Sequence, residues 1–239
     1  MRIQVIASGS SGNCYLIDDG VSKLLLDAGI PVREIRRHVQ PTTLDAVLVT
    51  HRHKDHCKAV KDLCKVGVPV FALPDVLLAE GVDHHPCAHP VAPSIREDGT
   101  IIKTYWVGGY DIIPFRTEHD VPNVGYIVQS LHTGESLLYF TDTMYVRYRF
   151  PPLDYMLVEA NYCEDVLTDN VVEGIINADL AKRVRKTHMS LESLLAMLRA
   201  NDLSNLKQIY LLHLSDNNSD ERRIKTEVQK ITGSEVYVA

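Results

Sequence analysis

The chain has 239 residues, of which 45% are hydrophobic and 23% charged, and its formal net charge at pH 7 is −6. These values are typical of a globular protein and fit one domain, residues 1–239, with a substantial core. They argue against attraction of the whole surface to nucleic acid, although a local basic groove is compatible with them. No apolar run reaches the length of a membrane span, and the apolar stretch before Ser8 is too short for a signal peptide, so we expect a cytoplasmic protein.

The first half of the chain alternates short strand-like runs with turns rich in Gly, Asn and Asp, which tolerate positive φ. Its predicted elements are the strands Ile3–Ala7, Cys14–Asp18 and Lys23–Leu26, a helix over Pro31–Val39, the strand Ala46–Val49 and a helix over Cys57–Val66. Proline at the first helical position favours the first of these helices. Gly81–Thr100 is rich in Pro and His and is interpreted as a long surface loop.

The second half begins with strands and ends with helices between strands. Its predicted elements are the strands Asp111–Phe115, Val124–Ser130, Ser136–Thr141, Tyr155–Glu159, Gln208–Leu212 and Glu235–Val238, with helices over Ser190–Ala200 and Asp220–Thr232. Ser190 and Ser219 are the predicted caps of these two helices. This order predicts an α/β fold in which two mixed β-sheets pack face to face with helices outside.

The five cysteines form no Cys-x-x-Cys pair and are interpreted as reduced thiols: Cys14, Cys57, Cys64, Cys87 and Cys163. Cys57 follows a histidine-rich motif and is a conceivable metal ligand. We favour the simpler interpretation of a small buried residue at a helix start.

That motif, His51-Arg52-His53-Lys54-Asp55-His56, places four ligand-type side chains within six residues, between an apolar strand and a predicted helix. Neutral imidazole and carboxylate suit zinc and similar metals. A loop at a strand end directs alternate side chains towards one point, so His51 and His53 would share one metal while Asp55 and His56 serve a second. The alternative is a polar loop in which Asp55 caps the helix and the histidines are solvated.

The motif Thr-His-x-His-x-Asp-His after a buried strand resembles the signature of the metallo-β-lactamase superfamily, and the rest of that pattern follows in order. The further matching residues, each at or just after the end of a predicted strand, are Asp27, His119, Asp142 and His213. The resemblance implies that Asp27 orients a ligand through a hydrogen bond. It covers nearly the whole chain and implies a metallo-β-lactamase αββα sandwich.

The resemblance also implies how two divalent ions, zinc first and manganese as the alternative, would be held. His51, His53 and His119 would bind one ion, Asp55, His56 and His213 the other, and Asp142 would bridge them. A bridging carboxylate supplies the negative charge that two neighbouring dications need. The pair would hold a hydroxide that is a nucleophile at neutral pH.

Two further features favour a nuclease within this superfamily. Glu159-Ala160-Asn161 and His188-Met189-Ser190 resemble the accessory glutamate and histidine of the ribonuclease Z group, in which the histidine protonates the leaving oxygen. Ser8–Cys14 and the segment from His213 to Asn218 resemble the small YycJ/WalJ-type proteins, which are associated with DNA exonuclease activity. The simpler interpretations are that Glu159 and His188 are ordinary polar residues at element ends, and that Ser8–Cys14 is a hairpin turn.

Basic side chains near these positions add support for a polyanionic substrate. Arg147, Arg149 and Lys186 are the candidate phosphate contacts, and Lys182, Arg183 and Arg185 lie in the same basic run as Lys186, although a charge run is often only a solvated surface. Ser8–Cys14 lacks the Gly-Lys-Ser/Thr of a phosphate-binding loop, so no nucleotide cofactor is expected. His84, His85 and His89 lie together in the Pro-rich loop and are interpreted as exposed side chains.

The sequence thus predicts a dinuclear-metal phosphodiesterase that acts on nucleic acid, DNA rather than RNA, by attack of a metal-bound hydroxide on phosphorus. Asp55, Glu159 and His188 are its candidate catalytic residues, Asp55 being a metal ligand as well. Two alternatives use the same ligands: a thioesterase or small-molecule esterase of the glyoxalase type, and a non-catalytic module in which the metal is structural. The sequence does not predict the direction of cleavage or the oligomeric state.

Overall fold

The computed structural model describes residues 1–96 and 98–239, which form two compact units. The first unit comprises Met1–Arg96, Ile101–Arg116 and Val121–Glu135, and the second is built mainly from Thr117–Asp120 and Ser136–Ala239. Within the described residues, no helix combines the length and the hydropathy that crossing a membrane requires.

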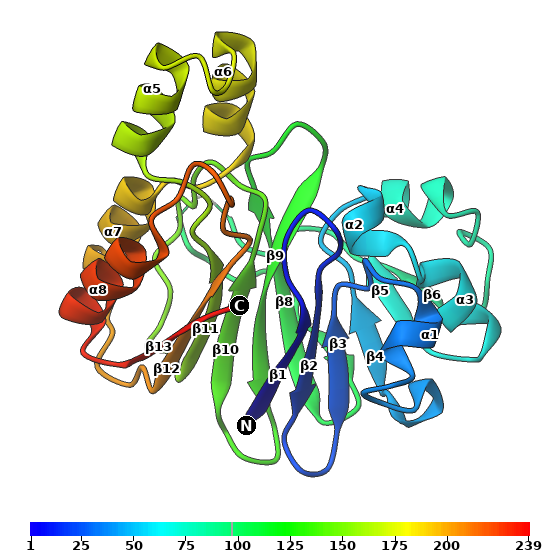
Figure 1. The fold of residues 1–239 in the computed structure, drawn as a ribbon. Coiled ribbons are helices and arrows are strands. Elements are labelled where there is room, and N and C mark those ends of the chain that lie inside the picture. The colour runs from blue at the N-terminus through cyan, green and yellow to red at the C-terminus, as the bar shows by residue number, and fades with distance from the viewer. Residues whose placement is uncertain (97) are drawn as a thin grey trace. The chain divides into compact units, whose positions relative to one another are not determined.

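The first unit contains a six-stranded mixed sheet whose strands follow one another in chain order (Figure 1, blue to cyan). They are β1 (Arg2–Ala7), β2 (Cys14–Asp18), β3 (Lys23–Leu26), β4 (Ala46–Leu48), β5 (Val70–Ala72) and β6 (Ala88–Pro90). The first three are antiparallel to one another, and β3 to β6 are parallel. Strands β4 and β5 are buried at every position, as is usual where parallel strands are covered on both faces.

Short helices connect these strands: α1 (Val32–Ile35), η1 (Pro41–Thr43), α2 (Lys54–Cys57), α3 (Val60–Lys65) and α4 (Pro74–Ala79). The helix predicted over Cys57–Val66 is wrong in its bounds, because α2 and α3 are separate. The break has a tertiary cause, since the amide of Ala59 donates to the carbonyl of Ala28, 2.8 Å away, instead of continuing one helix. Cys57 is buried, as predicted, but it is the last residue of α2 and not the first residue of a helix.

The predicted helix over Pro31–Val39 is shorter in the structure, where α1 ends at Ile35. Pro41 disfavours helical backbone at the residue before it, and Gln40 is extended. The intervening residues form turns, in which His38 and Val39 both donate to the carbonyl of Ile35.

Three strands of the first unit, in the spatial order β9-β8-β7, form its second sheet layer: β7 (Tyr105–Val107), β8 (Tyr110–Thr117) and β9 (Asn123–Ser130). Buried tyrosines join this layer to the six-stranded sheet. The hydroxyl of Tyr126 donates to the carbonyl of Val49 (2.6 Å), and that of Tyr110 donates to the carbonyl of Ser22 (3.0 Å). Each bond satisfies a polar group within an otherwise apolar core.

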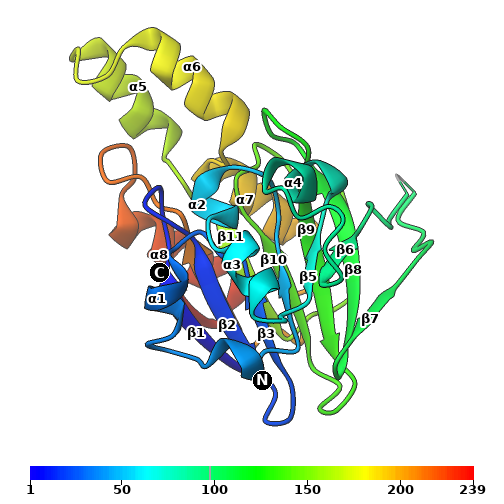
Figure 2. The same cartoon turned by 90° about the vertical axis from the view of Figure 1, so that its right-hand side faces the viewer.

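The second unit has four parallel strands in the order β10 (Ser136–Phe140), β11 (Tyr155–Glu159), β12 (Gln208–Leu212) and β13 (Glu235–Val238). Its helices are α5 (Glu164–Val172), α6 (Ala178–Thr187), α7 (Leu191–Arg199) and α8 (Glu221–Thr232). Ser190 caps α7 as predicted, but Asp220 caps α8 in place of Ser219. The hairpin α5–α6 was not predicted, and within this unit it extends beyond the strands (Figures 1 and 2, yellow-green).

The histidine-rich loop and the cysteines complete the comparison with the predicted elements. Gly81–Thr100 is not wholly irregular, because it contains β6, which pairs with β5; its residue Glu97 lies outside the described residues. His89 on β6 stacks on Phe71 at a centroid distance of 4.8 Å. All five cysteines are free thiols, as predicted.

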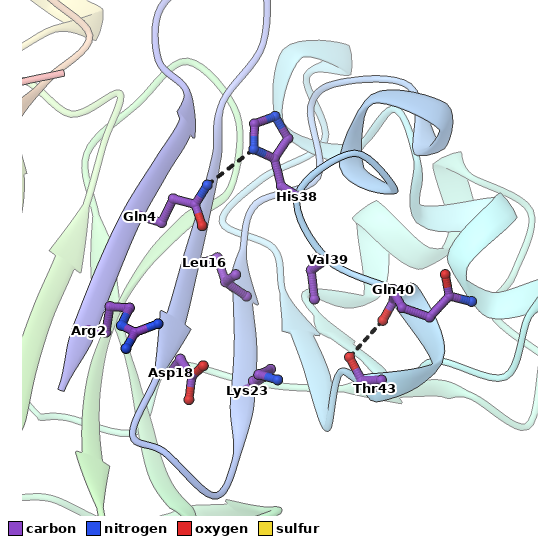
Figure 3. Close-up of a pocket in the computed structure, with 9 residues that line it drawn as sticks. All are labelled: Arg2, Gln4, Leu16, Asp18, Lys23, His38, Val39, Gln40 and Thr43. Atoms are coloured by element: carbon purple, nitrogen blue, oxygen red, sulfur yellow. Dashed lines mark hydrogen bonds between the residues drawn. The ribbon is translucent and has the colours of Figure 1, made fainter.

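A cavity of about 370 Å³ lies in the first unit, over β1 to β3 and beside the segment that follows α1 (Figure 3). Gln4 and His38 both line it and are joined by a hydrogen bond, with Nε2 of Gln4 3.1 Å from Nδ1 of His38. Arg2, Asp18 and Lys23 line it from the sheet side. None of the predicted site residues is among its lining side chains, so this cavity is separate from the predicted chemistry.

Candidate metal centre

Three residues in the described part of the chain, other than glycines, have positive φ: Asp27 (55°), Asp142 (51°) and His213 (57°). Asp27 and His213 directly follow β3 and β12, and Asp142 lies two residues after the end of β10. Left-handed backbone costs a residue with a side chain on the order of 1–3 kcal/mol, and such strain concentrates at functional sites. All three are residues that the sequence predicts for the metal site.

The first unit brings together the four ligand-type side chains of its motif. His51 and His56 are fully buried, and their ring centroids lie 4.1 Å apart. Nε2 of His51 is 3.0 Å from Nδ1 of His53, and Nε2 of His56 is 3.5 Å from Oδ2 of Asp55. The residue at the cap position of α2 is His53, and no side chain makes a capping bond there. The alternative of a capping Asp55 is therefore wrong.

Buried Asp27 fixes the orientation of His56. Nδ1 of His56 lies 2.6 Å from Oδ2 of Asp27, and the amide and hydroxyl of Thr50 also donate to this carboxylate. With the Nδ1 proton donated to Asp27, the lone pair of the neutral ring is on Nε2. That is the form in which imidazole binds a metal.

We expect Asp27→Asn to weaken metal binding by about 10- to 100-fold, which is typical when the hydrogen-bond partner of a ligating histidine is lost. The amide would still fit the site but would no longer hold His56 in the ligating tautomer by charge. Titration of the metal-free protein with zinc, followed by calorimetry, measures the change. The exposed Asp169→Asn serves as the control, and equal affinities for wild type and Asp27→Asn would show that Asp27 has no such role.

Asn13, which the sequence interpretation did not single out, anchors the motif from the Ser/Gly loop. Its side chain is fully buried, and Nδ2 lies 3.1 Å from Nε2 of His56. The backbone amide of Asn13 donates to the carbonyl of Asp55 (2.7 Å). The loop itself is a turn closed by a bond from the amide of Gly12 to the carbonyl of Gly9 (3.0 Å), in agreement with the simpler hairpin interpretation.

Gly29 lets the backbone pass directly against the motif. A Cβ atom at this position would lie 1.6 Å from the carbonyl oxygen of Asp55, and the Gly29 amide donates to the carbonyl of Asn13 (2.9 Å). The obstacle is backbone, so it cannot rotate away. The shape of the loop that carries Asp55 and His56 therefore depends on the missing side chain.

Gly29→Ala should consequently destabilise the protein by about 2 kcal/mol or more, by displacing backbone in a packed region. It should also lower the metal bound per chain, because the displaced segment carries two predicted ligands. Thermal unfolding and elemental analysis measure the two effects. Ser10→Ala, an exposed change in the neighbouring loop, should alter neither. Wild-type stability with full metal content would contradict the expectation.

The second unit gathers a further cluster at the ends of its strands. Asp142, Glu159, His188 and His213 each offer a ligand atom, and these atoms lie within 4.8 Å of one another. Nε2 of His213 is 3.8 Å from Oδ1 of Asp142, and the rings of His188 and His213 stack at 5.2 Å. Glu159 is fully buried, and Asp142 and His213 nearly so. The sequence predicts all four for the site.

His119 belongs to the same unit and is oriented by the end of α6. Its Nδ1 lies 3.0 Å from the carbonyl of Thr187, to which it donates, so the lone pair of the neutral ring is on Nε2. Burial lowers the pKa of His119, against the opposing effects of Asp142 and Asp120. A neutral imidazole is the form that ligates a metal.

Glu159 and His188 form the predicted pair. Nδ1 of His188 lies 2.6 Å from Oε1 of Glu159, while Oε2 of Glu159 accepts from the amides of Thr143 (2.9 Å) and Met189 (3.2 Å). Burial lowers the pKa of His188, but the charges of Glu159 and Asp142 raise it by more, to about 9. The contact with Glu159 therefore holds the ring of His188 in one orientation and favours its protonated form.

Asn161 is a second site residue to which the sequence analysis assigns no role, although it belongs to the segment Glu159-Ala160-Asn161. Its Nδ2 donates to the carbonyl of His213 (2.7 Å) and lies 3.0 Å from Nδ1 of the same residue. This contact holds the strained backbone after β12.

The remaining candidates are placed as follows. Arg147 forms an ion pair with Glu118, and Arg149 is exposed. Lys186 lies on α6, one residue before the carbonyl that holds His119. His84 is almost fully exposed and lies beside Asp83. Among the described residues, no group with metal-binding geometry includes His84, His85 or His89.

Comparisons with known proteins agree with these features. The Beta-lactamase superfamily domain matches residues 22–214. The Exodeoxyribonuclease WalJ of Streptococcus pneumoniae is 31% identical over 252 residues, which cover 99% of this chain and 90% of the relative. The Exodeoxyribonuclease YycJ of Bacillus anthracis is 27% identical over 233 residues, which cover 92% of this chain and 85% of the relative.

The metallo-β-lactamase fold protein YhfI from Bacillus subtilis has a crystal structure that matches with a TM-score of 0.71 at 17% identity, covering 99% of this chain and 95% of that one. This likeness confirms the predicted fold, with two mixed β-sheets and helices outside. Proteins of this superfamily bind divalent metal ions, and the chain has clusters of the His and Asp donors that such ions need. The chain belongs to the metallo-β-lactamase superfamily and, within it, to the family of the WalJ and YycJ proteins.

Proposed function

We propose that this protein is a metal-dependent phosphodiesterase that cleaves DNA in the manner of an exonuclease. The observation that carries the proposal is the buried Glu159 carboxylate 2.6 Å from Nδ1 of His188, in one cluster with Asp142 and His213. An alkoxide is a poor leaving group, so cleavage of a phosphodiester benefits from an oriented acid of this kind. The exodeoxyribonuclease names of the relatives support the same substrate class.

We further propose that the two units make one catalytic domain, which binds two divalent ions. One ion would be held by His51, His53 and His119, the other by Asp55, His56 and His213, with Asp142 between them. The donor chemistry fits, because imidazole and carboxylate without thiolate suit zinc, with manganese as the alternative. The bonds from His56 to Asp27 and from His119 to Thr187 support it, since each leaves the lone pair of the neutral ring on Nε2.

When bound, the ions would polarise the scissile phosphate and activate water. The protein's own groups do the rest. Glu159 accepts a hydrogen bond from Nδ1 of His188 and stabilises the protonated, positively charged ring, whose second proton, on Nε2, would pass to the departing oxygen. The amides of Thr143 and Met189 hold Glu159 in place. Asp27 keeps the ring of His56 fixed, and the backbone amide of Asn13 holds the loop at the carbonyl of Asp55.

The direct test is a substrate panel with protein loaded with zinc or manganese, after elemental analysis of the metal content. We expect two ions per chain, hydrolysis of bis(p-nitrophenyl) phosphate and shortening of end-labelled DNA, all abolished by a chelator. DNA and RNA strands of one sequence, single and paired, define the preference. Failure to hydrolyse either phosphodiester would refute the proposal, and thioester hydrolysis in its place would favour the glyoxalase-type alternative.

A further inference from the structure

A cavity of about 640 Å³ opens beside His119 within the second unit. Sites for small ligands typically enclose roughly 300–1,000 Å³, so it can receive a nucleotide-sized group. Its lining includes the polar side chains of His119 and Asp120 and the apolar side chain of Met144. The rest of its lining comes from helix α6: Asp179, Lys182, Arg183, Lys186 and Thr187.

The residues of α6 that line the cavity recur at intervals of three and four, so they form one stripe along the helix. The other side of α6 contacts α5. Arg185 donates to Glu164 of α5 (2.7 Å), and Ala181 and Val184 pack with Leu167 in the core of the α5–α6 hairpin. The stripe is therefore presented by a helix whose orientation is fixed.

The three cations of the stripe are available to a ligand. Within the described residues no ion pair involves Lys182, Arg183 or Lys186. Lys182 and Lys186 are separated by about 6 Å along the helix axis, which is comparable to the spacing of neighbouring phosphates on an extended strand. Charge complementarity thus favours a polyanion with evenly spaced charges.

The lining contributed by Met144 differs in chemistry from that of α6. Met144, which lines the cavity, and its chain neighbour Tyr145 lie on the loop that follows Asp142 and are 43% and 50% exposed, although both side chains are large and apolar. Single-stranded nucleic acids bind where a cationic groove for the backbone lies beside side chains on which unpaired bases stack. A duplex would offer this cavity only its backbone, because its bases are paired.

We infer that the cavity beside His119 binds a single strand of DNA, with phosphates on Lys182, Arg183 and Lys186 and a base against Met144 and Tyr145. This inference rests on the proposed function and deepens it by naming the strand-binding element, helix α6. It also assigns a role to Asp179, the carboxylate of the stripe. Because Asp179 lies one helical turn before Lys182 and Arg183, its charge opposes the phosphates and limits affinity.

The test is binding of a fluorescein-labelled single-stranded oligodeoxynucleotide to metal-free protein, by fluorescence anisotropy across a salt series. The double variant Lys182→Ala/Lys186→Ala should bind on the order of tenfold more weakly at low salt. Its plot of log affinity against log salt should be shallower by about 1.4, because each phosphate contact on a single strand contributes about 0.7. Asp179→Asn should bind more tightly than wild type, and Tyr145→Ala more weakly without a change of slope.

The double variant Lys225→Ala/Lys230→Ala on α8 removes the same charge from the same unit and should bind like wild type. Equal weakening by both double variants would overturn the inference, because it would reflect net charge alone. Binding of duplex DNA, or of RNA of the same sequence, more tightly than single-stranded DNA would also overturn it. Failure of the proposed function is distinct, since wild-type protein would then bind the strand yet hydrolyse neither phosphodiester when metal is added.

Discussion

Replacing Asp142 by asparagine should lower phosphodiester cleavage by about a thousandfold or more, and should reduce the bound metal below two ions per chain. The carboxylate is the predicted bridge, and without it two neighbouring dications would repel each other with no shared negative charge. A loss of about 4 kcal/mol in transition-state stabilisation corresponds to a thousandfold in rate. Elemental analysis and cleavage of labelled DNA measure the two losses.

Asparagine is the appropriate replacement because of the backbone at this position. Asp142 has φ 51°, and asparagine tolerates left-handed backbone better than other residues with a side chain. The variant should therefore fold, which circular dichroism and the unfolding midpoint can check. Asp169→Asn on α5 removes an equal charge from an exposed position and should leave both measurements unchanged. Two bound ions together with more than a tenth of the wild-type rate in Asp142→Asn would exclude a bridging role.

The features that the sequence predicts well are those encoded locally. His51, His53, Asp55 and His56 lie within six residues, so their convergence needs only one loop. Asp142 and His213 follow apolar runs that end abruptly, which marks them as strand-end residues before any fold is known. The positive φ at these two positions supports the same interpretation, since strain is retained where function requires it.

The features that the sequence does not predict depend on distant partners. Asn13 contacts His56 43 residues away, and Asn161 contacts His213 52 residues away, so each is locally an ordinary asparagine. The break between α2 and α3 has the same origin in the bond from Ala59 to Ala28. Helix α6 is a different case, because its cap signal was present. Asn177 accepts from the amide of Leu180, and an asparagine before a charged amphipathic run could have indicated the helix start.

His188→Ala should retain the metal content but lower the rate of DNA cleavage by about 10²- to 10⁴-fold, the usual contribution of a positioned acid. Its effect should depend on the leaving group. The departing oxygen of DNA is a strongly basic alkoxide that needs a proton, whereas p-nitrophenolate leaves readily without one. The loss for bis(p-nitrophenyl) phosphate should therefore be much smaller than the loss for DNA.

Glu159→Gln extends the same argument to the partner of His188. The amide keeps the size of the side chain but removes the charge that lies 2.6 Å from Nδ1, so the proton on His188 is held less firmly. Its rate should fall less than that of His188→Ala, again with a larger loss for DNA than for the activated diester. His132→Ala removes an exposed histidine and is the matched control. Equal losses on both substrates would mean that His188 acts on metal geometry or binding, and a wild-type rate on DNA would remove it from the mechanism.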